Sequence, residues 1–276
     1  MNDLSRPKRH FALVGYVLLF WVAYLVILVL VSKVKSLVPN ELGQLVWGAV
    51  CSILLLALSL ILLKRNARTP SDVGLGFNPA SLLRLAAGGI VGLAIPGLIL
   101  VIFIAFTGPF PISWSAKIHL SQVMLVISTC LTLSCMEELG FRGYPLPTLV
   151  QNIGFWQAQG TVEVAFALCH ILYGWSWQSV CYGVLPSGLL FGIAAIVSRG
   201  LALPIGLHAG LNIGQWAVGD TGLLLLSLSE KQRARIATIT PITGMSVVLL
   251  TAFAFWFWHR HRCNLDASEA GSISRG

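Results

Sequence analysis

Charged side chains are scarce in this sequence of 276 residues. Asp, Glu, Lys and Arg together account for 10% of the chain, whereas 56% of the residues are hydrophobic and the mean hydropathy is +0.82. Soluble globular domains carry about 25% charged residues. The composition therefore excludes an ordinary soluble domain and places the chain among integral membrane proteins.

Several kinds of short motif are absent as well. The six cysteines form no C-x-x-C pair and have no metal-type spacing, which argues against a zinc ribbon or a disulfide framework. The chain has no Walker or dinucleotide-binding glycine pattern, which excludes nucleotide-dependent enzymes of those types. The formal net charge of +8 does not indicate a nucleic-acid partner, because the basic residues lie mainly in the gaps between apolar segments.

Long apolar segments make up most of what is present. A transmembrane helix needs about 20 mainly apolar residues, and eight segments approach or reach this length. We expect them at residues 11–32, 42–63, 85–106, 120–137, 159–172, 177–197, 201–218 and 239–258. The sequence thus predicts an all-α fold, a polytopic integral membrane helical bundle with about eight transmembrane helices.

The predicted bundle is one membrane domain with three parts. Residues 1–118 hold the N-terminal transmembrane helices and a cytoplasmic loop, residues 119–218 hold the core helices, and residues 219–276 hold the last transmembrane helix and a polar tail. An even number of spans places both termini on one side. Twelve of the eighteen Lys and Arg residues fall on that side and six on the other. Because cytoplasmic loops are enriched in Lys and Arg, we expect a multi-pass protein with cytoplasmic termini, in the plasma membrane if the source is bacterial.

Three charged residues lie where the fourth apolar segment is predicted to end, at the cytoplasmic side. Glu137 and Glu138 are adjacent, and Arg142 follows Glu138 at the i, i+4 spacing that lets two side chains pair on a helix. Glu137 is rotated by about 100° around the helix and is left without that partner. Ionisable residues within membrane segments are costly, face the protein interior and mark function. The spacing therefore predicts a structural Glu138–Arg142 pair and leaves Glu137 free, and taken alone Glu137 fits an interfacial carboxylate better than a catalytic one.

Two later helices carry the only histidines embedded in apolar helical sequence. Phe166 and His170 are spaced i, i+4, and so are His208 and Asn212. Since lipid is their only alternative environment, these polar side chains are expected to converge with the unpaired carboxylate inside the bundle. Glu163 shares the face of His170, but its position predicts an interfacial charge at the start of a helix rather than a partner in the site.

Three short motifs thus follow one another on successive hydrophobic helices. In chain order they are Glu137-Glu138-x-x-x-Arg142, Phe166-x-x-x-His170 and His208-x-x-x-Asn212. Together they resemble the CPBP intramembrane protease family, also called the ABI family, which includes CaaX prenyl endopeptidases and bacteriocin-processing or self-immunity proteins. The resemblance covers about residues 125–218. It implies that residues 119–218 form a catalytic core that hydrolyses peptide bonds within the membrane, near its cytoplasmic face.

The resemblance also implies a role for each motif residue. Glu137 would be the general base that activates a water molecule, assisted by His170, while His208 and Asn212 would stabilise the oxyanion. The residues expected to support the site are Glu138, Arg142 and Phe166. The residue types suit this chemistry, since a carboxylate in an apolar cavity can take up a proton and donors aimed at an oxyanion lower the barrier.

Other readings of the same residues stay open. Glu137, His170 and His208 could instead hold a zinc ion with an open position for water. They come from three helices without an H-E-x-x-H motif, so the sequence does not decide, and we favour a mechanism without a cofactor. The rival classes are a non-catalytic immunity or scaffold protein that retains the motif and, less favoured, a proton-coupled transporter, which would show two similar halves with broken helices. The expected partners are the lipid bilayer and a membrane-embedded or lipidated peptide or protein substrate, and not nucleic acid.

Overall fold

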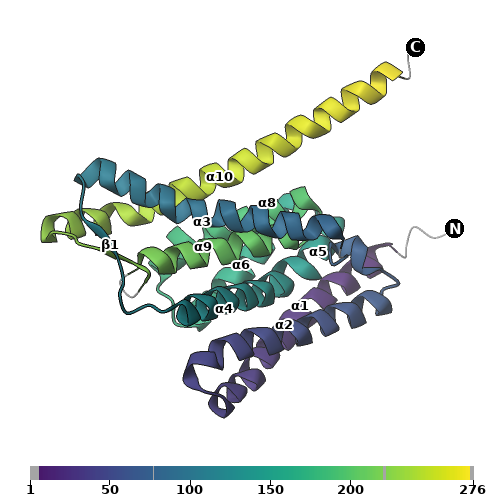
Figure 1. The fold of residues 1–276 in the computed structure, drawn as a ribbon. Helices are drawn as coiled ribbons and strands as arrows, with labels where there is room; N and C mark the ends of the chain where they lie inside the picture. Colours follow the sequence, from purple (N-terminus) through teal and green to yellow (C-terminus); the bar gives the residue numbers. More distant parts are fainter. Residues whose placement is uncertain (1–5, 77, 220–221, 274–276) are drawn as a thin grey trace.

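The structure is a computed structural model that describes residues 6–76, 78–219 and 222–273, with side chains described within residues 13–261 of these ranges. It is an all-α bundle (Figure 1). The α-helices are α1 (Arg6–Ser32), α2 (Asn40–Arg65), α3 (Pro79–Thr107), α4 (Leu120–Glu138), α5 (Pro145–Ile153), α6 (Phe155–Leu172), α7 (Trp177–Ser179), α8 (Leu185–Ser198), α9 (Ala202–Val218) and α10 (Glu230–Ile273). The short elements are the 3-10 turns η2 (Lys33–Leu37) and η3 (Pro70–Val73), the π-helical turns η4 (Leu139–Gly143) and η5 (Val180–Val184), and the paired strands β1 (Ile112–Trp114) and β2 (Leu224–Leu226).

Within the described chain, six helical segments are long and apolar enough to cross a membrane. They are Leu13–Leu37, Asn40–Arg65, Pro79–Thr107, Leu120–Ile153, Trp177–Ser198 and Glu230–His261. The two other predicted spans are also helical, as α6 and α9, with 18 and 17 residues. The predicted integral membrane bundle of about eight helices is therefore confirmed.

The helices that carry the three motifs lie in the middle of the bundle. In Figure 1, α1 and α2 lie along one side and α10 along the other, with α4, α6 and α9 between them. Among the packed pairs are α2 with α4, α3 with α9, and α8 with both α9 and α10. α1 begins and α10 ends at the same end of the bundle, which we call the terminal end; β1 marks the opposite, distal end.

Glycines let α3 and α9 approach until their backbones touch. A methyl group at any of four positions would collide with the opposite helix backbone. These positions are Gly88, Gly92, Gly206 and Gly210. Small residues commonly allow such close approach in membrane bundles, where lipid removes most of the hydrophobic drive for helices to associate. This glycine seam fixes α9 against α3.

The helical segment that carries the two glutamates continues beyond the end of α4 at Glu138. After α4 the chain makes the π-helical turn η4 and continues as α5 to Ile153. Glu137 therefore lies near the middle of the span Leu120–Ile153, seventeen residues after its start and sixteen before its end. The α-helix α4 itself ends at Glu138, as predicted, but the helical segment continues beyond it, which was not predicted. A π turn takes up an extra residue within a helix, and Pro145 stands in the first turn of α5, where its missing N–H breaks no helical hydrogen bond.

The last helix is also longer than predicted. α10 begins at Glu230 rather than near residue 239 and continues to Ile273. The hydroxyl of Ser229 accepts a hydrogen bond from the N–H of Gln232, and the side-chain oxygen of Gln232 accepts one from the N–H of Ser229. This capping box satisfies backbone donors at the start of the helix, which explains why a polar segment joins it.

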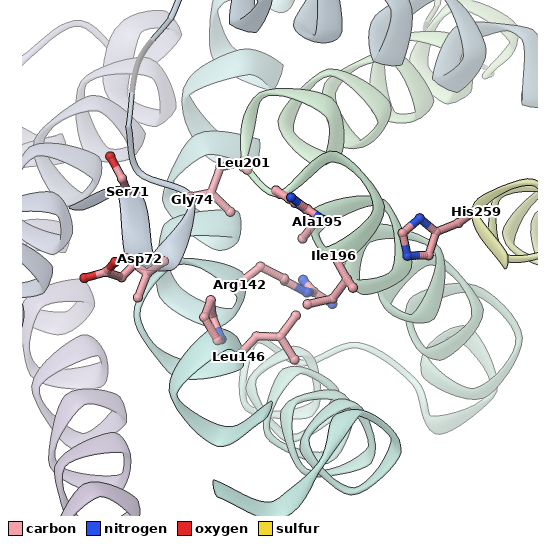
Figure 2. A pocket seen from close by; sticks show the side chains of 13 residues that line it. Ser71, Asp72, Gly74, Arg142, Leu146, Ala195, Ile196, Leu201 and His259 are labelled. Carbon is pink, nitrogen blue, oxygen red and sulfur yellow. The ribbon is translucent and has the colours of Figure 1, made fainter. Parts of the chain in front are cut away.

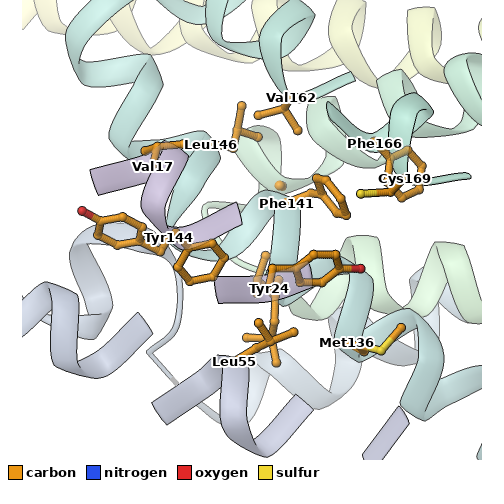
Figure 3. Close-up of a cluster of buried hydrophobic side chains, with 14 of the residues drawn as sticks. Val17, Tyr24, Leu55, Met136, Phe141, Tyr144, Leu146, Val162, Phe166 and Cys169 are labelled. Carbon is orange, nitrogen blue, oxygen red and sulfur yellow. The ribbon is translucent and has the colours of Figure 1, made fainter. Parts of the chain in front are cut away.

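An aromatic cluster fixes the π turn that follows the glutamates. Phe141 lies between Tyr24 of α1 and Phe166 of α6, with ring centroids 5.2 and 5.0 Å away (Figure 3). Trp21 Nε1–H donates to the backbone oxygen of Gly140 over 3.2 Å, and a methyl group at Gly140 would lie 2.6 Å from the Tyr24 ring. α1 therefore positions this turn, although it lies outside the segment that carries the motifs.

Candidate active site

Three helices bring one carboxylate and two imidazoles together inside the bundle. Glu137 Oε2 on α4 lies 3.9 Å from His170 Nε2 on α6 and 3.7 Å from His208 Nε2 on α9. The three side chains are 15%, 9% and 9% exposed, respectively. Glu137 Oε2 is buried and has no direct hydrogen-bond partner among the described residues. The structure thus gathers three of the four residues predicted as catalytic around one point.

Each histidine is oriented by a hydrogen bond at its other ring nitrogen. His170 Nδ1 lies 2.9 Å from the backbone oxygen of Phe166, one turn earlier in α6. His208 Nδ1 lies 2.9 Å from Glu138 Oε1. A carbonyl oxygen and an ionised carboxylate can only accept hydrogen bonds, so both Nδ1 atoms carry the hydrogen. Both Nε2 atoms are then the ones that face Glu137.

Glu138 links His208 to a buried arginine. The predicted pair is present, with Arg142 Nη1 donating to Glu138 Oε1 over 3.3 Å and both side chains fully buried. The same oxygen accepts the hydrogen bond from His208 Nδ1. Glu138 therefore orients His208 in addition to pairing with Arg142.

Glu163 is a buried member of this network, and its prediction as an interfacial charge is wrong. Its side chain accepts hydrogen bonds from Arg142 Nη2 over 3.0 Å and from Gln159 Nε2 over 2.7 Å. The sequence contained a pattern that indicates burial of Glu163 beside the site. Gln159, Glu163 and His170 share one face of α6, at spacings of four and seven residues. The position of Glu163 was misleading because α6 begins earlier than expected, at Phe155.

Two glycines of α8 make room for these side chains. The backbone oxygen of Gly188 accepts from Arg142 Nη2 over 3.1 Å and from Gln159 Nε2 over 3.4 Å. A methyl group at Gly188 would collide with the Glu163 carboxylate, and one at Gly192 would collide with the Gln159 amide. We call the connected side chains the buried polar chain; they are Gln159, Glu163, Arg142, Glu138 and His208.

Aromatic rings enclose the histidines. The Phe166 ring meets the His170 ring edge to face at a centroid distance of 4.6 Å, and the Arg142 guanidinium lies 4.4 Å from the Phe166 centroid. Phe191 of α8 stacks on His208 at 4.4 Å. Phe166 thus forms a wall of the site and adds a cation–π contact that stabilises Arg142. No sequence pattern indicated a role for Phe191, because α8 is apolar along most of its length and its hydrophobic positions look alike in the sequence.

Asn212 stands apart from these contacts. It lies one turn after His208 in α9 and is half-buried. Within the described part of the chain its side chain forms no hydrogen bond with Glu137, His170 or His208. The structure therefore places Asn212 beside the site without joining it to the other three residues.

The three side chains at the centre of the site are spaced slightly more widely than the ligands of a zinc ion. Ligands of a tetrahedral zinc ion with bonds of about 2.0 Å lie about 3.3 Å from one another. The separations from Glu137 Oε2 to the two histidine nitrogens are larger, at 3.7 and 3.9 Å. Among the described residues, no group of three or more His, Cys, Asp or Glu side chains is arranged to hold a metal ion.

Two cavities approach the site from opposite ends of the bundle. One, of about 450 Å³, is lined by η3, α5 and the turn between α8 and α9, and it reaches Arg142 (Figure 2). The other, of about 650 Å³, lies between α3, α9 and α10 and includes Trp175, whose ring is 5.1 Å from that of His170. Glu137 lines neither cavity. The first cavity thus reaches the partner of Glu138, and the second reaches the aromatic ring beside His170.

The cavity at Arg142 has one carboxylate in its lining. Asp72 accepts a hydrogen bond of 2.6 Å from the N–H of Thr69, and this bond lowers the pKa of the Asp72 carboxyl below its ordinary value. Thr69 and Asp72 form a capping box on η3. Asp72 is therefore an ionised structural residue of its loop and does not serve as a second base.

Residues 119–214 match the family model described as Type II CAAX prenyl endopeptidase Rce1-like. No curated protein matches the chain. The matched segment includes Glu137, His170, His208 and Asn212, and it also includes the whole buried polar chain. The chain thus carries an Rce1-like segment at residues 119–214, and the family resemblance predicted from its motifs is confirmed.

Proposed function

We propose that this integral membrane protein is an endopeptidase that hydrolyses a peptide bond of a membrane-embedded or lipidated peptide or protein. One observation carries the proposal: Glu137 Oε2 faces two imidazole nitrogens at 3.7 and 3.9 Å inside the bundle. A carboxylate with a neighbouring imidazole suits proton transfer from water. The match of residues 119–214 to an Rce1-like family model supports the same class of activity.

In this mechanism Glu137 is the general base. A water molecule between Glu137 and His170 gives a proton to the carboxylate while its oxygen attacks the carbonyl carbon of the substrate. His170 Nε2 accepts the second hydrogen bond of that water, since the ring hydrogen is on Nδ1 and is bound to the Phe166 carbonyl. When the tetrahedral intermediate collapses, the C–N bond breaks and the proton passes from Glu137 to the leaving amine. The carboxylate is thereby restored.

His208 and Asn212 bind the oxyanion. The Nδ1–H of His208 already donates to Glu138, so a second hydrogen on Nε2 makes the ring a cation, which the adjacent carboxylate stabilises. Asn212 supplies an amide N–H one turn later on α9. Each such donor contributes about 2.7–4 kcal/mol to lowering the barrier.

The reaction takes place inside the bundle. Glu137 lies near the middle of its helical span, so we place the scissile bond within the bundle and not at the cytoplasmic surface. We keep the termini on the cytoplasmic side, as the distribution of basic residues favours. A substrate must therefore present an unwound peptide bond to the interior.

Replacement of the base tests the function directly. Glu137→Gln keeps the size of the side chain and removes the proton acceptor, so turnover should fall by about 10²–10⁴-fold. Comparative peptidomics of membranes from wild type and Glu137→Gln cells should then show a set of membrane-protein termini that only the wild type produces. Glu41→Gln, on the exposed start of α2, is the matched control. Identical termini in the two membranes would contradict proteolysis.

The same variants separate the rival functions. A non-catalytic immunity or scaffold protein keeps its cellular phenotype in both Glu137→Gln and His208→Ala, whereas an endopeptidase loses it in both. A proton-coupled transporter loses uptake of its substrate without any change in protein termini. Addition of a zinc chelator to the purified protein should leave turnover unchanged; a loss that added zinc restores would overturn the mechanism without a cofactor.

A further inference from the structure

Arg142 has one positive charge and faces two buried carboxylates. Glu138, on the same helical span, pairs with Nη1 at 3.3 Å, and Glu163, on α6, pairs with Nη2 at 3.0 Å. Glu138 alone would neutralise Arg142, so the need for a counter-ion does not explain Glu163. A buried carboxylate is costly and is retained where it has a structural or functional role.

The orientation of Arg142 is set by helices other than its own. Nη2 donates to Glu163 Oε1 on α6 and to the backbone oxygen of Gly188 on α8, at 3.0 and 3.1 Å. These two acceptors fix Nη2. Because the guanidinium group is planar, Nη1 then points toward Glu138. Glu163 is held in turn by Gln159 Nε2, which donates to the same oxygen over 2.7 Å.

The contacts end at the imidazole that faces the general base. Glu138 Oε1 accepts hydrogen bonds from both Arg142 Nη1 and His208 Nδ1. A displacement of Arg142 therefore moves the oxygen that orients His208. No ion pair or hydrogen bond joins Glu163 directly to Glu137 within the described part of the chain.

We propose that Glu163 is a positioning residue of the active site, which acts through Arg142 and Glu138 to hold His208 against Glu137. The inference rests on the proposed proteolytic function. It adds to the three motifs a residue that none of them contains, and it assigns to α6 two tasks: His170 faces the reaction, and Glu163 holds the opposite histidine in place.

Glu163→Gln is the principal test. The variant keeps the shape of the side chain and an acceptor oxygen but removes the charge that holds Arg142. We expect kcat to fall by about 10- to 100-fold with KM unchanged, because a displacement of about 1 Å far from the chemistry can reduce the rate about 100-fold. In ¹⁵N spectra of labelled histidine, the His208 resonance should shift, while that of His119, at the opposite end of α4 from Glu138, stays in place.

Two further variants keep the test decisive if Glu163→Gln fails to fold. Gln159→Leu removes one hydrogen bond to Glu163 and leaves every charge, so it should lower kcat by less and shift the His208 resonance in the same direction. Ser59→Ala, on α2, removes another fully buried hydrogen bond outside the buried polar chain and should change neither kcat nor that resonance.

Glu137→Gln, measured in the same assay, separates failure of this inference from failure of the function. If Glu137→Gln is inactive while the Glu163 and Gln159 variants keep the wild-type kcat and His208 resonance, Glu163 has no positioning role and the protease stands. If those two variants lose thermal stability but keep the wild-type kcat per folded molecule, Glu163 only stabilises the fold and the inference is overturned. If Glu137→Gln is as active as the wild type, both proposals are wrong.

Discussion

The two faces of α9 pack against neighbouring helices in opposite ways. Toward α3 the helix presents Gly206 and Gly210, which allow direct backbone contact and involve no charge. Toward α4 and α8 it presents His208, which is bonded to Glu138 and stacked on Phe191. The glycine face depends on the absence of side chains, whereas the histidine face depends on the presence of several specific ones.

This difference shows how a membrane bundle can hold a polar site in place. Lipid offers no polar partner to buried charges, so the residues around His208 must satisfy one another. Van der Waals contact along the glycine seam fixes the backbone of α9 and adds no polar group that needs a partner. Substitutions on the two faces should therefore have different signatures: loss of turnover on the histidine face, and loss of stability on the glycine face.

The largest loss of stability is expected when Arg142, the cation that pairs with Glu138 and Glu163, is replaced. Arg142→Met leaves Glu138 and Glu163 buried without a counter-ion, and removal of one partner of a buried ion pair costs about 3–5 kcal/mol. Chemical unfolding in detergent micelles should show this loss of free energy. The triple variant that adds Glu138→Gln and Glu163→Gln should recover part of it. Equal stability of Arg142→Met and the wild type would mean that the carboxylates are not charged.

A smaller effect, confined to activity, is expected at His208. His208→Ala removes the proposed oxyanion donor, so kcat should fall by about 100- to 1,000-fold, equivalent to about 2.7–4 kcal/mol. Glu138 keeps its ion pair with Arg142 when the ring is removed, so thermal unfolding should change less than in Arg142→Met. A variant with normal turnover would remove His208 from the mechanism and weaken the contrast between the two faces.

On the glycine face the expected loss is one of stability. Gly210→Ala places a methyl group against the backbone of Gly89 and should cost about 1–3 kcal/mol through overpacking. Gly97→Ala is the matched control, because a methyl group at Gly97 of α3 meets nothing within 4 Å. Unfolding curves of the two variants test this prediction; equal curves would show that the glycine seam can open without penalty.

The smallest effect lies outside both faces, in the loop before α3. The pKa of Asp72 is lowered in the folded protein by the N–H of Thr69, so this contact contributes stability above the ordinary carboxyl pKa of about 3.9 and loses it as the pH falls through the lower folded value. Asp72→Asn should therefore lower the thermal midpoint slightly at neutral pH, with the difference from wild type shrinking in acid. A difference that grows in acid would contradict this assignment.

The wrong prediction for Glu163 shows that contacts between separate helices could not be predicted from this sequence. The i, i+4 spacing correctly predicted that Glu138 and Arg142 pair, because both residues lie on one helical span and the pair is local. Glu163 is twenty-one residues from Arg142, and their contact depends on how α6 is rotated and how deep it starts in the bundle. Helices that are apolar on most sides give a weak periodic signal, so neither quantity could be predicted.

The continuation of the fourth helix beyond Glu137 could not be predicted for a related reason. Glycines and prolines near Gly140 and Pro145 indicate a break in most helices, but here the π turn absorbs the irregularity. That turn is held by Tyr24 and Trp21 from α1, more than a hundred residues earlier in the chain. The division into parts at residues 1–118, 119–218 and 219–276 stays a prediction.

The membrane class, the approximate positions of eight long helices and the Glu138–Arg142 pair could be predicted from the sequence, because hydrophobic content and one-turn spacing are local properties of a chain. Three outcomes became visible in the fold alone: Glu137 lies near the middle of its helical segment, Asn212 is not bonded to the other site residues, and Glu163 belongs to the buried polar chain. These outcomes depend on the depth and rotation of several helices at once. The depth and rotation of these helices are set by contacts between segments that are distant in the sequence, such as the glycine seam between α3 and α9.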